Sequence, residues 1–333
     1  MSREKLQKLG LDLPVLPTST VGSFPKPDYL IEARAQATRN AITKTELDRL
    51  ERKATEFWVG LQEELGLDVL VDGEQYRGDM VAYFAETMPG FAKGGLVRSY
   101  GNRYYHKPVM VGPVRWPGPM TVDWWRWTQA LTSRPVKGML TGAYTLMDWS
   151  FDDHYPDRRT ACLALAREVR KEVEALLDAG ARIIQIDEPA LSVRPDELPF
   201  AVEAMHLTVD GLAAYYVVHA CFGAFETIYP GLLDLPVDNL DLAISHSALD
   251  LLGMFKKNPF TKDLSLGVLD VHSHTVEAAD DVQGRIRRGT SVLPADRIWV
   301  DPDCGLKTRT VEESRAKLSA MMAAVRAARA ELG

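Results

Sequence analysis

Short apolar runs alternate with helical segments over nearly all 333 residues, and this alternation restricts the possible folds more than any other feature. The runs, rich in β-branched and aromatic residues, are 18–22, 68–72, 136–142, 182–187, 215–219, 240–245, 264–271 and 297–301. Between them the apolar spacing is helical, as in 160–179, whose apolar stripe is Leu163, Ala166, Val169, Val173 and Leu176. Eight strand–helix repeats predict an α/β fold, a single (β/α)8 TIM barrel.

The same pattern predicts one domain over residues 1–333 with its core at 18–310. Segment 89–123, between the second and third strands, is rich in Gly, Pro, Tyr and Trp and contains a further β-like run at Val109 to Val111. A loop of this length rarely lacks structure, so we expect a hairpin-like insertion. Its aromatic residues could dock a partner, although covering the barrel is the favoured interpretation. Segment 311–333, rich in Ala and Arg, is expected to be a C-terminal helix.

Composition excludes several classes of protein. The net charge of -7 argues against a nucleic-acid partner. No apolar run approaches the roughly 20 residues that span a bilayer, and the N-terminal residues are polar, unlike a signal peptide. Three widely spaced cysteines make a poor disulfide framework but could supply metal thiolates in a reducing compartment. We therefore expect a cytoplasmic protein without a membrane partner.

Polar or special residues follow every predicted strand. The sets are Gly22-Ser23, Asp72-Gly73-Glu74, Thr141-Gly142, Asp187-Glu188, His219-Ala220-Cys221, Ser245-His246-Ser247, Asp270-Val271-His272 and Asp303-Cys304-Gly305. In a barrel these strand ends meet on the face where enzymes build their sites. His219 and Cys221 are two residues apart in an extended segment, so both could grip one metal ion. Cys221, His246 and Cys304 could converge there, whereas Cys162 falls inside a helical pattern and is expected to be a buried core residue.

Five longer motifs follow one another along the chain between Thr18 and Arg309. They are TVGSFP at 20–25, VDGE at 71–74 with DMV at 79–81, VKGMLTG at 136–142, IQIDEPAL at 184–191 and DPDCGLKTR at 301–309. In this order they resemble the C-terminal catalytic half of cobalamin-independent methionine synthases, and the short single-domain relatives of that half. The resemblance implies a zinc-dependent S-methyltransferase that methylates the thiol of homocysteine to form methionine.

The resemblance also implies that His219, Cys221 and Cys304 are Zn2+ ligands. The family's further ligand, a glutamate, falls on His246 when counted from Asp241, and a shift of one residue would place Ser245 there. His246 is preferred because imidazole is a normal zinc ligand and a serine hydroxyl is not. Two thiolates and two neutral imidazoles leave the site neutral, whereas a carboxylate leaves it negative. The neutral site should lower the pKa of a substrate thiol more, yet weaken the bound thiolate as a nucleophile.

Other residues at the strand ends suit an amino-acid thiol. Asp187 and Glu74 could pair with the α-ammonium, although either carboxylate could instead cap a helix. The backbone N–H groups around Gly22 and Ser23 could bind the α-carboxylate, since glycine permits close approach. By the resemblance, the residues near homocysteine also include Val21, Met80 and Glu188.

Two further roles come from the resemblance. His272 matches a histidine that acts as an acid toward the leaving group of the methyl donor, a task that suits a side chain titrating near neutrality. Trp149 matches an aromatic residue on which the pterin stacks, with a core tryptophan as the alternative. His274 has no match in the family and is expected to be a solvated neighbour.

The expected methyl donor is a methylated corrinoid protein or free methylcobalamin. Full-length members of the family are about twice as long, and their N-terminal barrel helps to hold the folate. Methyltetrahydrofolate remains the alternative donor. Another small thiol, such as coenzyme M, is an alternative acceptor, but it has no ammonium for Asp187 and Glu74 to bind. A non-catalytic metal-binding protein is the third hypothesis, and the polar residues at so many strand ends argue against it.

Overall fold

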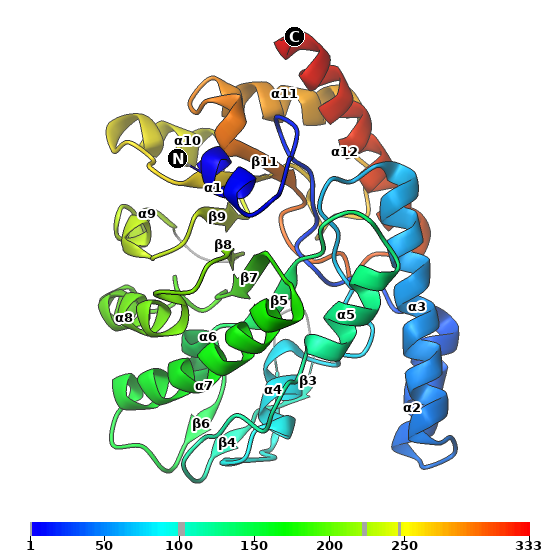
Figure 1. The fold of residues 1–333 in the computed structure, drawn as a ribbon, viewed down its shortest axis with the longest axis vertical. Coiled ribbons are helices and arrows are strands. Elements are labelled where there is room, and N and C mark those ends of the chain that lie inside the picture. The colour runs from blue at the N-terminus through cyan, green and yellow to red at the C-terminus, as the bar shows by residue number, and fades with distance from the viewer. Residues whose placement is uncertain (1, 99–103, 222–224, 246–247) are drawn as a thin grey trace. The chain divides into compact units, whose positions relative to one another are not determined.

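The computed structural model describes residues 2–98, 104–221, 225–245 and 248–333. Its helices are α1 Ser2–Lys8, α2 Asp28–Thr38, α3 Lys44–Leu65, α4 Met80–Thr87, α5 Val122–Ala130, α6 Ala143–Asp148, α7 Arg158–Ala179, α8 Leu198–Val209, α9 Phe225–Ile228, α10 Ala248–Lys257, α11 Ala279–Thr290 and α12 Val311–Leu332. Its strands are β1 Phe91–Ala92, β2 Leu96–Arg98, β3 Tyr104–His106, β4 Val109–Met110, β5 Gly138–Thr141, β6 Phe151–Asp152, β7 Ile183–Asp187, β8 Tyr215–Ala220, β9 Asn239–Leu242, β10 Asp263–Gly267 and β11 Ile298–Asp301. Figure 1 labels most of these elements along the chain.

Six of the eight expected strands form one sheet in the order β11-β10-β9-β8-β7-β5. The pairs β5–β7, β7–β8 and β10–β11 are parallel. The first two expected strands contribute single parallel bridges instead, Thr18 to Val300 and Leu70 to Val136. The α/β class and the order of the strands are therefore those expected of a (β/α)8 barrel. No helix among the described residues has both the length and the apolar character needed to cross a membrane.

The chain divides into two compact units. The first unit consists of Met1–Tyr76, Arg126–Lys137 and Asp241–Gly333, and the second of Arg77–Trp125 and Gly138–Leu240. Organisation as one domain over 1–333 stays a prediction.

In the second unit, α7 supplies a long apolar face. It begins at the N-cap Asp157, whose side chain accepts a hydrogen bond from the N–H of Thr160, and ends at Gly180 in the left-handed conformation. The predicted stripe on α7 is buried throughout. Its burial against α8 and β5, with roughly 25 cal/mol gained per Å2 of apolar surface, explains why the helix forms where the spacing predicts it.

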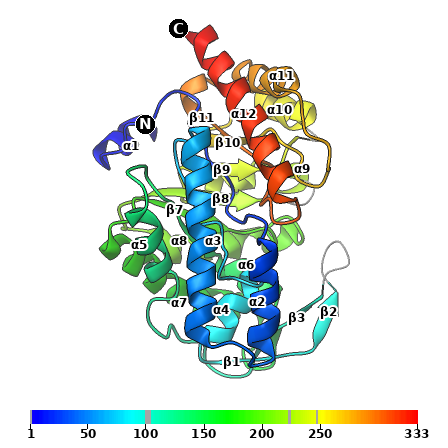
Figure 2. The ribbon, with the colours of Figure 1, turned by 90° about the vertical axis from the view of Figure 1, so that its right-hand side faces the viewer.

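The insertion after residue 89 contains the expected hairpin. Strands β2 and β3 pair antiparallel, with Val97 opposite Tyr105, and Figure 2 shows them side by side. Strand β4 pairs with β1 and β6. The buried carboxylate of Glu172 on α7 accepts hydrogen bonds from the indole N–H of Trp116 (2.7 Å) and the backbone N–H of Thr121 (2.7 Å). The insertion is thus tied to α7 by hydrogen bonds to a buried carboxylate.

In the first unit, aromatic packing fixes the segment that follows the first expected strand. The rings of Phe24 and Trp58 stack with centroids 4.4 Å apart, and the indole N–H of Trp58 donates to the carbonyl of Pro25 (3.0 Å). Trp58 lies on α3, which packs along α2 (Figure 2). The backbone around Ser23 is therefore held by a helix from a later part of the chain.

Candidate metal centre and substrate site

Strand β8 carries the His-x-Cys pair to its carboxyl end. His219 is buried and stands in register with Asp187 of β7, while Cys221 follows the strand and is half-buried. In a parallel sheet, residues in register point to the same face, so the imidazole and the Asp187 carboxylate share a face. This placement follows from the apolar, β-branched strand, which buries on both faces and leaves its polar residues at the end.

Asp187 belongs to a row of polar groups in the second unit. Thr141, the last residue of β5, stands in register with Asp187, whose Oδ1 accepts a hydrogen bond from the amide of Gln185 (2.7 Å). The hydroxyl of Thr141 donates to the carbonyl of Met80 at the start of α4 (2.8 Å). The second unit therefore gathers Met80, Thr141, Asp187 and His219 at the carboxyl ends of three neighbouring strands.

Glu188 is buried and bound to the start of α6. Its carboxylate accepts hydrogen bonds from the N–H of Tyr144 (3.1 Å) and from the N–H (2.8 Å) and hydroxyl (2.6 Å) of Thr145. Burial nevertheless raises the pKa of Glu188 to about 7. A Cβ atom on Gly142 would lie 2.0 Å from the Glu188 carboxylate, so only glycine fits there. The side chain thus acts as a cap for α6.

Trp149 ends the same helix. It is the C-cap residue of α6, its N–H donates to the carbonyl of Thr145 (3.0 Å), and its side chain is half-buried. A tryptophan that lies wholly within a core would be less exposed. This partial exposure is compatible with the stacking role that the resemblance implies.

In the first unit, Asp303 connects three strand ends. Its carboxylate accepts hydrogen bonds from the N–H (3.0 Å) and the hydroxyl of Ser245, and its own N–H donates to the carbonyl of Leu269 (3.0 Å). Cys304 follows directly. One feature of the sequence pointed to Asp303 as a residue that connects strand ends: it precedes a predicted metal ligand within a polar run.

The next residues bring Cys304 close to Ser23. The N–H of Leu306 donates to the carbonyl of Ser23 (2.7 Å), and a Cβ atom on Gly305 would lie 2.0 Å from the Ser23 hydroxyl oxygen. Val21 and Gly22, just before, are buried. Glycine at 305 therefore permits the close approach to the first strand end.

Glu74 has a backbone conformation that the sequence did not reveal. Its φ is 54°, in the left-handed region that costs a residue with a side chain about 1–2 kcal/mol. Its N–H donates to the carboxylate of Asp72 (2.8 Å), and its carbonyl accepts from the amine of Lys26 (3.2 Å). Arg34, which also pairs with Glu51, donates to the next two carbonyls at 3.3 and 3.2 Å. The loop that presents Glu74 is held by cationic side chains from 26–34.

Burial lowers the pKa of Lys26 to about 8, with the positive charge of Arg34 acting in the same direction. The nearby Glu74 carboxylate opposes this shift. Lys26 therefore has a substantial neutral fraction in mildly alkaline solution. Its hydrogen bond to the Glu74 carbonyl does not depend on charge, since the neutral amine also donates.

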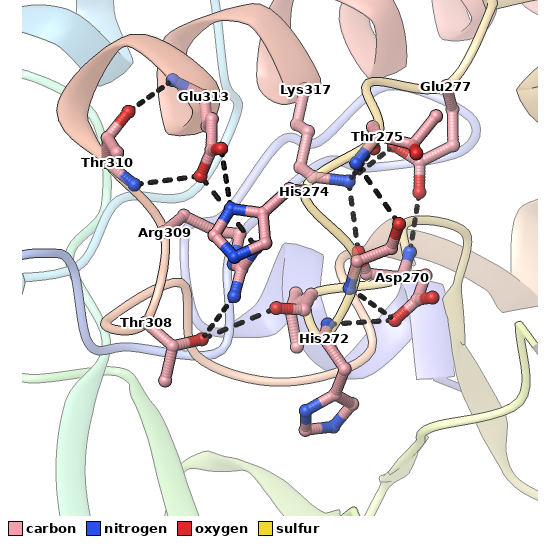
Figure 3. A network of polar contacts seen from close by, with 12 residues as sticks. Asp270, His272, His274, Thr275, Glu277, Thr308, Arg309, Thr310, Glu313 and Lys317 are labelled. Carbon is pink, nitrogen blue, oxygen red and sulfur yellow. Dashed lines mark hydrogen bonds and ion pairs between the residues drawn. The ribbon is translucent and has the colours of Figure 1, made fainter.

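His272 lies in the loop after β10 and is exposed (Figure 3). Its N–H donates to the Asp270 carboxylate (2.8 Å), which fixes the turn, and its ring points away from the surrounding polar network. His274 makes a different contact, between its Nδ1 and the Glu313 carboxylate (2.7 Å). The two histidines of this loop therefore have separate environments.

Three predicted ligands come together. One ring nitrogen of His219 and the sulfurs of Cys221 and Cys304 lie within 4.8 Å of one another. One imidazole and two thiols are the donors that zinc prefers, so the residues present fit a zinc ion. Cys162 is buried inside α7, where burial raises the pKa of its thiol, and it does not belong to this group. His246 lies outside the described residues.

An α/β fold with a potential His–Cys–Cys metal site at its strand ends defines the class of this protein. Residues 16–327 match the family described as the cobalamin-independent synthase, catalytic domain. The chain belongs to this family, as the motifs indicated.

Named relatives are similar over almost the whole chain. Two proteins named 5-methyltetrahydropteroyltriglutamate–homocysteine methyltransferase, from Paraburkholderia xenovorans (strain LB400) and Chelativorans sp. (strain BNC1), are 42% and 41% identical over 99% and 98% of this chain. The matched regions are 45% and 44% of those relatives, so the chain spans a little under half of their length.

A solved structure is similar over its full length. It is a B12-independent methionine synthase from Shewanella sp. W3-18-1 in complex with selenomethionine, with a TM-score of 0.85 and 28% identity. The match covers 96% of this chain and 99% of that one. The fold of that structure is therefore shared over almost the whole of this chain.

Proposed function

We propose that this protein transfers a methyl group to the thiol of homocysteine and so forms methionine. The observation that carries the proposal is the group His219, Cys221 and Cys304, whose ligand atoms approach within 4.8 Å in a chain of this family. The names of its relatives, and the selenomethionine bound to the similar structure, support an amino-acid thiol as the acceptor.

The donor set would hold a zinc ion. Zinc bound there would lower the pKa of the homocysteine thiol and favour the attacking thiolate. We further propose His246 as an additional ligand, with Ser245 as the alternative. The hydroxyl of Ser245 already donates to Asp303, and serine is a poor zinc ligand, so both points favour His246.

The remaining residues would orient the substrate. Asp187 and Glu74 supply carboxylates for the α-ammonium, and the N–H groups near Ser23 suit the α-carboxylate. Val21, Gly22, Met80 and Glu188 complete the proposed homocysteine site. Coenzyme M is the less favoured acceptor, since its sulfonate offers no ammonium group for these carboxylates to bind.

The proposed donor is a methyltetrahydropteroyl folate. The names of the relatives favour this donor, whereas nothing in those names supports the methylated corrinoid that we expected from the chain length. In the reaction the new S–CH3 bond forms as the N–CH3 bond of the pterin breaks, and the departing nitrogen takes up a proton. His272 would donate that proton, and Trp149 would stack on the pterin ring.

Methionine formation tests the proposal directly. Zinc-loaded protein and homocysteine are incubated in parallel with 5-methyltetrahydropteroyltriglutamate, methylcobalamin and a methylated corrinoid protein, and a further set replaces homocysteine with coenzyme M. We expect methionine from the pterin donor. Methionine from a corrinoid donor alone would contradict the proposed pterin donor. Methyl transfer to coenzyme M alone would contradict homocysteine as the acceptor.

Two cysteine variants distinguish the loss of a metal ligand from a general effect on folding. Cys304→Ser should bind less zinc and lose at least about a thousandfold in turnover, because it removes one of the thiolates of the group. Cys162→Ala is the matched control, since this cysteine is buried in α7 outside the group. Full zinc binding and activity in Cys304→Ser would contradict the proposed metal site.

A further inference from the structure

Lys317 of α12 is a lysine whose side chain is wholly buried (0% exposed). An amine removed from water needs polar partners, and Lys317 finds all of them in the loop that carries His272. Its Nζ donates to the carbonyls of Asp270 (3.0 Å) and Thr275 and pairs with the Glu277 carboxylate (2.9 Å). Figure 3 shows these contacts converging on one nitrogen atom. The loop thus closes around the tip of a side chain from another element.

A chain of contacts leads from Lys317 to the backbone of His272. The second oxygen of Glu277 accepts a hydrogen bond from the N–H of Asp270 (2.8 Å). The carboxylate of Asp270 in turn accepts from the N–H of His272 (2.8 Å) and of Ser273 (3.3 Å). Lys317 therefore holds both polar groups of the Asp270 backbone, its carbonyl directly and its N–H through Glu277.

Different kinds of contact hold the two ends of this loop in place. Residues 268 and 269 continue β10, because the N–H of Val268 donates to the carbonyl of Asp301 (2.8 Å) and the carbonyl of Leu269 accepts from Asp303 (3.0 Å). Beyond them, the Lys317–Glu277 pair is buried, with its two side chains 0% and 9% exposed. The neighbouring His274–Glu313 contact involves a largely exposed histidine and is expected to contribute little.

We propose that Lys317 is a positioning residue for His272, acting through Glu277 and Asp270. This inference rests on the proposed function, in which His272 delivers a proton to the leaving group. Proton delivery requires the donor within hydrogen-bonding distance of the acceptor, and a misplacement of about 1 Å can cost a hundredfold in rate. A buried ion pair is weak evidence for stability, but it can select one loop conformation among several.

Lys317→Met and Glu277→Gln test the proposal. Lys317→Met removes the amine and keeps the length of the side chain, while Glu277→Gln is the milder change and serves if the first variant folds poorly. In either variant we expect kcat to fall by about ten- to a hundredfold, the KM for homocysteine to change by less than about twofold, and the zinc content to be unchanged.

A double-mutant cycle separates positioning from general damage. In a His272→Ala background, Lys317→Met should lower kcat no further, because the residue that it positions is already absent. Arg315→Met is the matched control: it breaks an exposed ion pair between α12 and Glu64 and should leave kcat unchanged in both backgrounds. Equal losses of kcat from Lys317→Met with and without His272 would overturn the proposal, as would an unchanged kcat.

A measurement that does not depend on turnover distinguishes the positioning role of Lys317 from the proposed methyl transfer. The ring signals of His272 in NMR spectra should shift or split in Lys317→Met, because the loop then samples more than one conformation, and should stay the same in Arg315→Met. Identical His272 signals in Lys317→Met and the parent protein would refute the positioning role. Absence of any methyl transfer by the parent protein would instead refute the proposed function.

Discussion

Glu74 shows how a single residue can carry strain at a proposed binding site. Its positive φ is unfavourable for a residue with a Cβ atom, yet hydrogen bonds from Lys26 and to Asp72 hold it in place. Strained backbone tends to persist where the surroundings impose it, and such places cluster at functional sites. The carboxylate of Glu74 is thereby presented from a fixed turn.

Glu74→Gly should therefore separate stability from function. Glycine adopts this φ without a steric cost, so we expect the free energy of unfolding to rise by about 0.5–1 kcal/mol in denaturant titrations. The KM for homocysteine should rise about tenfold or more, because a carboxylate proposed to bind its ammonium is gone.

Asn40→Gly is the control for this variant. Asn40 has a similar φ of 55° but lies on an exposed turn after α2, so it should leave KM unchanged. A Glu74→Gly protein that is less stable, or that binds homocysteine normally, would contradict the assigned strain or the assigned role.

Gly305 is another position where one added atom is expected to change stability and zinc binding. In Gly305→Ala the new Cβ atom would collide with the Ser23 hydroxyl, so either that side chain or the backbone beside Cys304 must move. We expect about 1–3 kcal/mol of destabilisation, measured by denaturant unfolding, together with weaker zinc binding.

The matched control is Gly60→Ala. Gly60 lies within α3, and a Cβ atom there would meet nothing within 4 Å. Since alanine favours a helix more than glycine does, this variant should gain about 0.5–1 kcal/mol and keep its zinc. Equal stability in Gly305→Ala and the parent protein would show that the contact with Ser23 is not rigid.

At the scale of elements, α12 is both a covering helix and an anchor for the His272 loop. It starts with a capping box: the Thr310 hydroxyl accepts from the N–H of Glu313, and the Glu313 carboxylate accepts from the N–H of Thr310. The helix packs along α11, and Figure 3 shows its first turns above the loop 270–277. The start of α12 therefore sets the place from which Lys317 reaches the loop.

Thr310→Ala should destabilise the protein by about 1 kcal/mol, since it removes a side-chain cap. Thr310→Ser keeps the hydroxyl and should recover most of this loss. The free energy of unfolding in denaturant measures both effects. A loss in Thr310→Ser as large as that in Thr310→Ala would show that the methyl group of Thr310, and not its cap, is the stabilising part.

At the scale of the whole molecule, the potential metal ligands follow strands that are far apart in the sequence. His219 lies near the end of β8 and Cys221 directly follows it, whereas Cys304 follows β11. A metal that binds only the folded chain stabilises it by mass action, by about 2.7 kcal/mol when the free metal is at a hundred times its dissociation constant. The stability of the protein should therefore depend on zinc concentration.

Metal removal tests this dependence. Chelation should lower the unfolding temperature, and added zinc should restore it in a concentration-dependent manner. Cys162→Ala should respond as the parent protein does, whereas Cys304→Ser should respond weakly. An unfolding temperature that is the same with zinc and with chelator would count against a zinc site formed by these residues.

The sequence alone determined much of the architecture and indicated the three residues of the potential metal site, because local patterns in the sequence predict both. Short apolar runs located the strands of the sheet and helical spacing located α7, and His-x-Cys at a strand end suggested two donors for one ion. The motifs then indicated the family. The first two strands were expected at full length but formed single bridges, because pairing depends on neighbours that the local pattern does not contain.

Only the tertiary structure decided which side chains hold the site in place. The left-handed turn at Glu74, the connection of Ser245 to Asp303 and the reach of buried Lys317 to the His272 loop all join residues that are distant in sequence. No periodicity marks such contacts, because a hydrogen bond between two loops depends on where both are placed by the packing beneath them.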